Sequence, residues 1–366
     1  METKAIIIKE GALQGLAEGY IECFGHAQAL IVAEEHEHLH YALPILRSLQ
    51  KEGVVASSHT FKRATFTKIF PLLEDKPVVP IFLGDDRLLS VGKRAAYKLN
   101  RSFAVIPTVL DSPALTSPWR LTWPGAFVPS QPPTLLLVDL KLVKEPKIRK
   151  EGVNEALLLL TLHGEAVLFS EENLRTDLHS LAFQSASEFF EAYLDKSKYA
   201  LTLLAKALAQ GGVVDQELEY IKTRNRRVPV SLLALALLYF AEQLFTLTDE
   251  DSIGHSPTQH KVLVNRLFLS DEQELLPGKE PKGFTKRPAL NHVKHTLETN
   301  LLSYEAIKEK LKEAGSVTTL EEARCSLSEL QDELLRLMLR SSHLGILDYY
   351  NELGLLDMAL TMLEGM

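Results

Sequence analysis

Two stretches of the chain contain dense groups of side chains that are able to do chemistry. The first is Glu34-Glu35-His36-Glu37-His38-Leu39-His40, in which the histidines alternate with other residues. In an extended segment this period of two places the histidines on one face, where they are able to bind zinc, nickel or copper. The alternative is a helix start, because the macrodipole favours carboxylates there. The second stretch is Lys222-Thr223-Arg224-Asn225-Arg226-Arg227, which suits either a phosphate or acidic partner or a solvated helix end.

The two cysteines exclude several kinds of site. Cys23 and Cys325 are too few for a disulfide scaffold or a four-cysteine zinc site, and they fit a reducing cytoplasm. Neither has a spaced histidine partner of the kind that activates a nucleophile, so packing is the favoured role for both. We therefore expect a cytoplasmic protein without a secretory signal.

Composition narrows the class of protein. The chain has 366 residues, 46% hydrophobic and 24% charged, which is typical of a folded globular protein. Its net charge of −8 disfavours nucleic acid as a partner, because an acidic chain gains little from counterion release. The most apolar stretch, 230–245, is too short to span a membrane and contains Glu242. The sequence thus predicts neither a nucleic-acid-binding protein nor a membrane protein.

The elements that must position these residues differ between the two halves of the chain. In the first half short apolar runs alternate with amphipathic ones, which predicts a parallel sheet covered by helices on both faces. The expected strands are 29–33, 78–83, 103–106 and 135–138, and the expected helices are 41–52 and 88–99.

The second half contains mainly helical patterns. We expect helices at 156–169, 187–210, 231–247, 303–314, 320–340 and 344–364, and a long loop at 271–288. The predicted fold is an N-terminal Rossmann-like α/β domain, residues 1–149, followed by an all-α domain, residues 150–366. A small-molecule ligand is then expected in the cleft between the two domains.

Several segments resemble one enzyme superfamily. They are Leu83-Gly84-Asp85-Asp86-Arg87-Leu88 with the following helix, Phe103-Ala104-Val105-Ile106-Pro107-Thr108, 129–140 and Gly345-Ile346-Leu347-Asp348-Tyr349-Tyr350. In order and over nearly the whole chain they resemble the iron-containing alcohol dehydrogenase, glycerol dehydrogenase and dehydroquinate synthase superfamily. Within it the sequence looks most like sn-glycerol-1-phosphate dehydrogenase. The resemblance implies a dehydroquinate synthase-like fold, an NAD(P) cofactor, a divalent metal (zinc or iron) and self-association into a homo-oligomer.

The resemblance assigns the cofactor to the segment after the strand at 78–83. The family has three glycines there, whose backbone N–H groups approach the pyrophosphate. This chain has Gly84, Asp85 and Asp86, whose carboxylates repel a phosphate and fit a helix N-cap instead. Lys93 is retained, as is Thr108 of the Pro-Thr pair. Glu34 or Glu35 has the place of the acidic residue that accepts a ribose hydroxyl in this fold.

The substrate and metal positions depart from the family pattern. Asp111 stands where the family has Ser and Pro113 where it has Asp, while Ser117 matches. The resemblance assigns the metal to Asn154, which replaces an Asp, to His260, and to a third ligand. The candidates for the third ligand are His292 and His295, which lack the family's following glycine. An amide is a weaker ligand than a carboxylate, and histidines on a surface or at a helix cap are the alternative.

Two functions remain open. One is a divergent pseudoenzyme that keeps the fold and uses a remodelled cleft for binding, regulation or assembly, with a protein partner or a second copy. The other is an active NAD(P)-dependent, metal-assisted oxidoreductase that reduces a small polyol phosphate or ketone. The shape-determining residues of the family are retained and several charge-determining ones are not, which favours the pseudoenzyme.

Overall fold

The computed structural model describes two compact units. It describes residues 3–366 except 111–114, 117–118, 123–125, 144–149, 170–175, 212–227, 253–255, 269–283, 285, 301 and 342–343. The first unit comprises residues 1–152 and 188–219, and the second comprises 153–187 and 220–366. The chain therefore divides after Gly152, and the segment 188–219 groups with the first unit.

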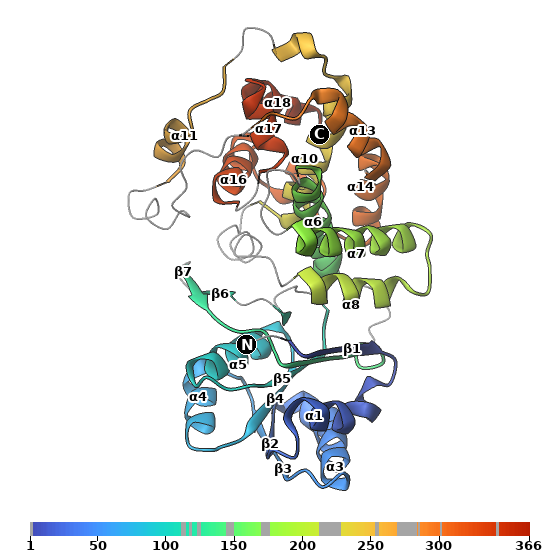
Figure 1. Ribbon diagram of the computed structural model, residues 1–366, viewed down its shortest axis with the longest axis vertical. Helices are drawn as coiled ribbons and strands as arrows, with labels where there is room; N and C mark the ends of the chain where they lie inside the picture. Colours follow the sequence, from blue (N-terminus) through green and yellow to red (C-terminus); the bar gives the residue numbers. More distant parts are fainter. Residues whose placement is uncertain are drawn as a thin grey trace. The chain divides into compact units, whose positions relative to one another are not determined.

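A parallel six-stranded sheet forms the centre of the first unit (Figure 1). Its strand order is β1-β8-β5-β4-β2-β3, and every pairing is parallel. The strands are β1 (Ala5–Lys9), β2 (Ala29–Glu34), β3 (Ala56–Phe61), β4 (Val79–Gly84), β5 (Ala104–Pro107) and β8 (Leu135–Asp139). The four predicted strands are thus confirmed within about one residue at each end. A separate antiparallel pair is formed by β6 (Trp119–Thr122) and β7 (Ala126–Pro129).

Helices pack on both faces of this sheet. The helices of the first unit are α1 (Leu16–Phe24), α2 (Glu35–Glu37), α3 (Leu43–Lys51), α4 (Phe66–Glu74), α5 (Asp86–Lys98) and α8 (Ala200–Gly211). Alternate strand residues such as Ile31 and Ile81 share a hydrophobic cluster with α1 and α3. Phe82 points to the other face, where its ring lies 2.5 Å from the position that a Cβ on Gly92 of α5 would take. The predicted Rossmann-like fold with a parallel sheet is confirmed.

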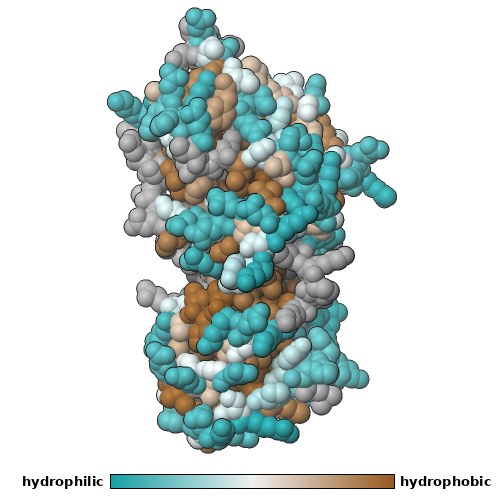
Figure 2. Space-filling model, turned by 90° about the vertical axis from the view of Figure 1, so that its right-hand side faces the viewer, coloured by the Kyte–Doolittle hydropathy of each residue, from teal (hydrophilic) through white to brown (hydrophobic). Residues whose placement is uncertain are grey.

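The second unit is helical among its described residues. Its helices are α6 (Lys150–Leu168), α7 (Thr176–Leu194, which continues into the first unit), α10 (Val230–Gln243), α11 (His260–Leu267), α13 (Leu290–Asn300), α14 (Tyr304–Glu313), α15 (Leu320–Ala323), α16 (Leu327–Arg340), α17 (Ile346–Glu352) and α18 (Leu356–Met362). Figure 2 shows hydrophilic side chains over much of the surface of each unit. Every residue of α10 from Ser231 to Leu238 is buried, which fits the mainly apolar sequence of this stretch.

Three of the predicted helices are wrong in length, because each is divided by a residue with positive φ. The range 187–210 falls in α7 and α8, which are separated at Lys196 with φ 53°. The range 320–340 divides at Arg324 with φ 54°, after which Ser326 and Glu329 form a capping box for α16. The range 344–364 divides at Gly354 with φ 74°. A left-handed residue cannot continue a right-handed helix, so each of these positions ends one.

No helix among the described residues is long and apolar enough to cross a membrane. Most of the predicted loop 271–288 lies outside the described residues.

Candidate functional site

The carboxyl ends of three neighbouring strands meet at one edge of the sheet. β2 ends at Glu34, β4 at Gly84 and β5 at Pro107, and β4 lies between the other two. The chain passes from β2 outward to β3, and from β4 in the opposite direction to β5. In open α/β sheets such a reversal of strand order is where ligands bind, outside the carboxyl ends of the strands. The predicted cofactor residues Glu34, Gly84 and Thr108 are therefore placed at the position that this fold uses for ligands.

Glu34 forms an ion pair with Arg87 through both of its carboxylate oxygens. Its two carboxylate oxygens accept from Nη2 of Arg87 at 2.6 and 2.7 Å, and Oε1 also accepts from the backbone N–H of Ala64 at 2.9 Å. The Glu34 side chain is 6% exposed and that of Arg87 is 40% exposed. The carboxylate that the fold would offer to a ribose hydroxyl is thus already bound by two groups of the same chain.

Glu37 lies beside it and is the residue that sequence reasoning missed as part of this site. It is 4% exposed, and its Oε1 accepts from the hydroxyl of Thr108 at 2.7 Å. Its Oε2 is buried without a hydrogen-bond partner and lies 3.0 Å from the position that a Cβ on Gly84 would take. Burial raises the pKa of the Glu37 carboxyl, and the hydrogen bond from Thr108 offsets this only in part. The carboxyl therefore fills the space that the missing side chain of Gly84 leaves open.

The N-terminus of α5 is capped by the residue that directly precedes the helix. Asp85 is the N-cap residue, and its Oδ1 accepts from the backbone N–H of Leu88 at 3.0 Å. Asp86 follows in the first turn, where the macrodipole favours its charge. The capping interpretation of these two residues is thus the one that the geometry supports. Lys93, farther along α5, is 3% exposed.

These residues do not fit a dinucleotide in the position that the fold offers. A pyrophosphate needs free backbone N–H groups at the helix N-terminus and close approach to glycine. Here an Asp85 oxygen takes the N–H of Leu88, and the Glu37 carboxyl lies against Gly84. Glu37 and Asp85 would both repel an approaching phosphate, and the cation nearest in sequence, Arg87, is paired with Glu34.

The histidine-rich segment is helical, in agreement with the helix start and not with the extended alternative. α2 leads into a π-helical turn over His38–Ala42, so residues two apart do not share a face. His36 has a side chain 72% exposed and lies 3.5 Å from Glu37, while Nε2 of His38 lies 3.0 Å from the hydroxyl oxygen of Ser58. In the described part of the chain no group of three or more His, Cys, Asp or Glu side chains is arranged to hold a metal.

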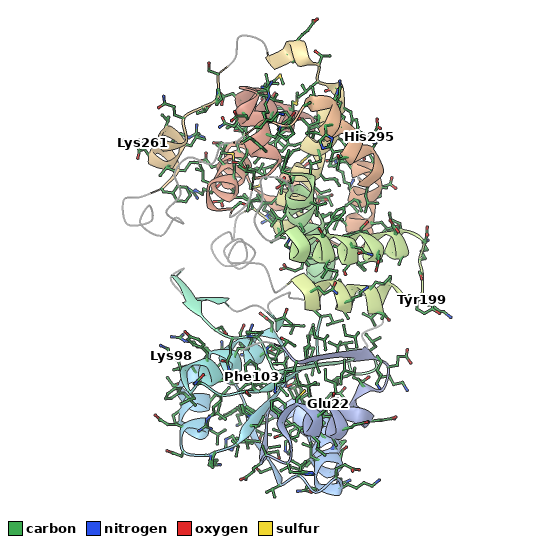
Figure 3. The ribbon with its side chains drawn as sticks, viewed as in Figure 1. Glu22, Lys98, Phe103, Tyr199, Lys261 and His295 are labelled. Atoms are coloured by element: carbon green, nitrogen blue, oxygen red, sulfur yellow. The ribbon has the colours of Figure 1, made fainter. Side chains whose placement is uncertain are left out.

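The predicted metal positions lie in the second unit and are engaged in other contacts. Oδ1 of Asn154 on α6 accepts from the hydroxyl of Ser316 at 2.7 Å. His292 and His295 lie exposed on α13, and His295, labelled in Figure 3, pairs with Glu298 at 3.6 Å. His260 is the first residue of α11. The described side chains of Asn154, His292 and His295 therefore do not fit a shared divalent metal, because the amide is committed to Ser316 and the two imidazoles are in contact with solvent.

Some predicted positions cannot be compared with the structure. Asp111 and Ser117, the expected substrate residues, and the basic stretch 222–227 lie outside the described residues. Both cysteines are free thiols, and burial raises the pKa of Cys23 and of Cys325. A raised thiol pKa opposes nucleophilic reactivity, in agreement with the packing role expected for them.

Comparison with known proteins identifies the fold. No family model and no curated protein sequence matches the chain. Among solved structures, maleylacetate reductase from Agrobacterium tumefaciens matches with a TM-score of 0.56 and 14% identity, over 98% of this chain and 96% of that one. Glycerol dehydrogenase from Schizosaccharomyces pombe matches with a TM-score of 0.56 and 14% identity, over 100% and 90%. An archaeal alcohol dehydrogenase from a Red Sea brine pool matches with a TM-score of 0.57 and 12% identity, over 98% of each chain.

These neighbours confirm the resemblance of fold that the sequence motifs predicted. The similarity extends over nearly the full length of each protein, so both units are included. Identities of 11–15% across the matched structures establish the shared fold and leave the chemistry to be argued from the residues. The closer likeness to sn-glycerol-1-phosphate dehydrogenase stays a prediction.

Proposed function

On the premise of a dehydrogenase fold, we propose that this protein is a pseudoenzyme that works by binding or assembly and not by hydride transfer. The observation that carries the proposal is the Glu37 carboxyl, buried against Gly84 and hydrogen-bonded to Thr108. It places a carboxyl group beside Gly84, at the position where a phosphate would approach the glycine backbone in this fold. The protein would then act in the cytoplasm through a small molecule, a protein partner or a second copy of itself.

The metal positions support the same proposal. Lewis-acid polarisation of a substrate carbonyl requires a firmly held cation, and carboxylate and imidazole ligands supply one. Asn154 instead accepts a hydrogen bond from Ser316, and the imidazoles of His292 and His295 are exposed. Each departure alone is open to rescue by a neighbouring residue, but departures at both the cofactor and the metal positions are hard to reconcile with one reaction.

The alternative is an active NAD(P)-dependent, metal-assisted oxidoreductase acting on a small polyol phosphate or ketone. It is favoured by the retained Gly84, Thr108 and Lys93 and by His260 at the start of α11. For this alternative Glu37 and Arg87 must move away from Gly84 and Glu34 when the cofactor binds. That movement would break the Thr108 hydrogen bond and the two-point ion pair.

Thermal denaturation of the full chain with NAD⁺, NADPH, ADP, zinc or nickel distinguishes the two functions. A ligand present at about 100 times its Kd stabilises the folded state by about 2.7 kcal/mol. The pseudoenzyme proposal predicts no shift with any dinucleotide at millimolar concentration, and no metal retained through purification by elemental analysis.

Two variants serve as controls for that experiment. If NAD⁺ or NADPH stabilises the protein, and Thr108→Val or Lys93→Met removes the effect, the proposal is wrong. Thr246→Val is the matched control, because the exposed Thr246 lies outside the strand ends and donates only to the backbone oxygen of Gln243. Metal bound to the wild type and lost in His260→Ala would also contradict the proposal.

A further inference from the structure

The helical unit contains a cavity that none of the predicted site residues line. It lies among α6, α7, α10, α13 and α17, and about 590 Å³ of space within it and at its mouth is free of protein atoms. Asn154, His292 and His295 are not among the lining residues, so the cavity is separate from the metal positions that the family resemblance assigns.

The wall of the cavity is apolar. Most of the lining side chains are aliphatic, among them Leu160, Leu168, Leu237 and Leu297. The two hydroxyl groups in the wall are satisfied within their own helices. The hydroxyl of Thr161 donates to the backbone oxygens of Leu157 and Leu158, and the hydroxyl of Thr296 donates to the backbone oxygen of His292. The wall therefore favours a hydrocarbon chain over water, since water needs two or more polar partners.

Small residues help to keep the space open. Ala241 of α10 and Gly164 of α6 both line the cavity. A Cβ on Gly164 would lie 3.1 Å from the ring of Phe183 on α7, so glycine allows the close approach of these two helices. A larger side chain at position 241 would extend into the space and fill it.

One acidic side chain gives the cavity a polar end. Glu165 lines it and also lines a smaller pocket beside Gly345 and Asp348. Its Oε2 lies 2.5 Å from the position that a Cβ on Gly345 would take, so the carboxylate packs closely against the backbone at the start of α17. A carboxylate at the wall of an apolar pocket attracts a cation and repels an anion.

We propose that this cavity binds a single-chain aliphatic amine. The hydrocarbon chain lies among the leucines of α6, α10 and α13, and the ammonium group lies next to the Glu165 carboxylate. Burial of the chain supplies most of the affinity and the charge supplies the selectivity. The proposal does not depend on whether the α/β unit binds a dinucleotide.

Calorimetric titration of the full chain with octylamine, octanol and octanoate tests the proposal, because the three probes share a chain length and differ in the charge of the polar end. We expect saturable one-to-one binding of octylamine, about tenfold weaker binding of octanol and no detectable binding of octanoate. Absence of octylamine binding, or any order in which octylamine is not the tightest, overturns the proposal.

Two substitutions locate the binding. Glu165→Gln is expected to reduce the affinity for octylamine about tenfold, to that of octanol, and to leave octanol unchanged. Glu309→Gln, which removes the same charge from an exposed position on α14, is expected to change neither. Ala241→Phe is expected to abolish binding of both. If Ala241→Phe does not fold, the Glu165→Gln result decides alone: an octylamine preference that survives it overturns the proposal.

Discussion

The strand ends of the α/β unit and the predicted metal positions of the helical unit differ in how their polar side chains are partnered. At the strand ends, residues from β2, the segment after it, the end of β5 and α5 bind one another: Glu34 pairs with Arg87, and Glu37 with Thr108. In the helical unit the described candidates do not meet. Asn154 binds Ser316, and His295 pairs with Glu298 on the surface of its own helix.

If the protein is the pseudoenzyme that we propose, the two regions correspond to two physical routes by which a site is lost. In the α/β unit the polar groups are buried and, apart from Oε2 of Glu37, bind one another, and these contacts contribute to stability. In the helical unit the imidazoles of His292 and His295 are exposed to solvent and contribute little to the free energy of unfolding. Substitutions should therefore have large effects on stability at the strand ends and small ones at the metal positions.

The largest effect is expected from Arg87→Met. It leaves the Glu34 carboxylate, 6% exposed, with the backbone N–H of Ala64 as its remaining hydrogen-bond donor among the described residues. We expect a loss of about 2–3 kcal/mol in the free energy of unfolding, measured with urea. Arg266→Met is the matched control, because the pair of Arg266 with Asp332 spans 3.8 Å and both side chains are about half exposed; its loss should stay below about 0.5 kcal/mol. Equal losses would contradict the comparison.

A smaller loss is expected from Gly84→Ala. The new Cβ would lie 3.0 Å from Oε2 of Glu37 and 3.3 Å from Cβ of Leu88, so it should destabilise the protein by about 1–2 kcal/mol. Combined with Glu37→Ala, the cost of the alanine at position 84 should fall by at least half, because its main neighbour is gone. Additive effects in this double-mutant cycle would show that Glu37 does not lie against Gly84.

Glu37→Gln is expected to stabilise the protein at neutral pH by up to about 1 kcal/mol. Since the pKa of Glu37 is raised above its ordinary value of 4.5, the folded state binds the proton more tightly than the unfolded chain, and this carboxyl favours unfolding as the pH rises above 4.5. The neutral amide removes that penalty. Urea unfolding from pH 4.5 to 8 should show a stability difference that grows with pH; a constant or decreasing difference would contradict the buried carboxyl.

Asn154→Ala should cost about 1 kcal/mol, because the mostly buried hydroxyl of Ser316 loses its acceptor. The double variant with Ser316→Ala should be no less stable than Asn154→Ala alone, since the unpaired hydroxyl is then removed as well. A clear further loss in the double variant would show that the two side chains act independently.

The smallest effects are expected from His292→Ala and His295→Ala. Both imidazoles are exposed on α13, so each variant should unfold within about 0.5 kcal/mol of the wild type and contain no less metal than it. A measurable loss of bound metal in either variant would show that these histidines bind a metal, as the family resemblance implies.

The sequence predicted the fold better than the site for identifiable reasons. The strands at 29–33 and 135–138 are unbroken apolar runs, and both are buried throughout. The edge strand β3, Ala56–Phe61, is polar and only half buried, so its pattern gave no comparable signal. Glycine at position 354 predicts a helix end, but lysine and arginine do not favour the left-handed conformation that Lys196 and Arg324 adopt.

The sequence predicted which residues lie at the strand ends but not the contacts of their side chains. Strand ends and motif order place Glu34, Gly84 and Thr108 at one edge of the sheet. The partner of Glu34 is decided by the reach of Arg87 across the sheet edge, and the burial of Glu37 depends on the helical course of the segment after β2. Such long-range side-chain pairings carry no local sequence pattern.

Titration of the full chain with NADH, followed by calorimetry and by nicotinamide fluorescence, tests the central claim most directly. If the Glu37 carboxyl blocks binding of a dinucleotide at Gly84, NADH should give no saturable heat and no change in fluorescence up to millimolar concentration. Saturable one-to-one binding that ADP displaces, and that is lost in Thr108→Val but kept in Thr246→Val, would contradict it.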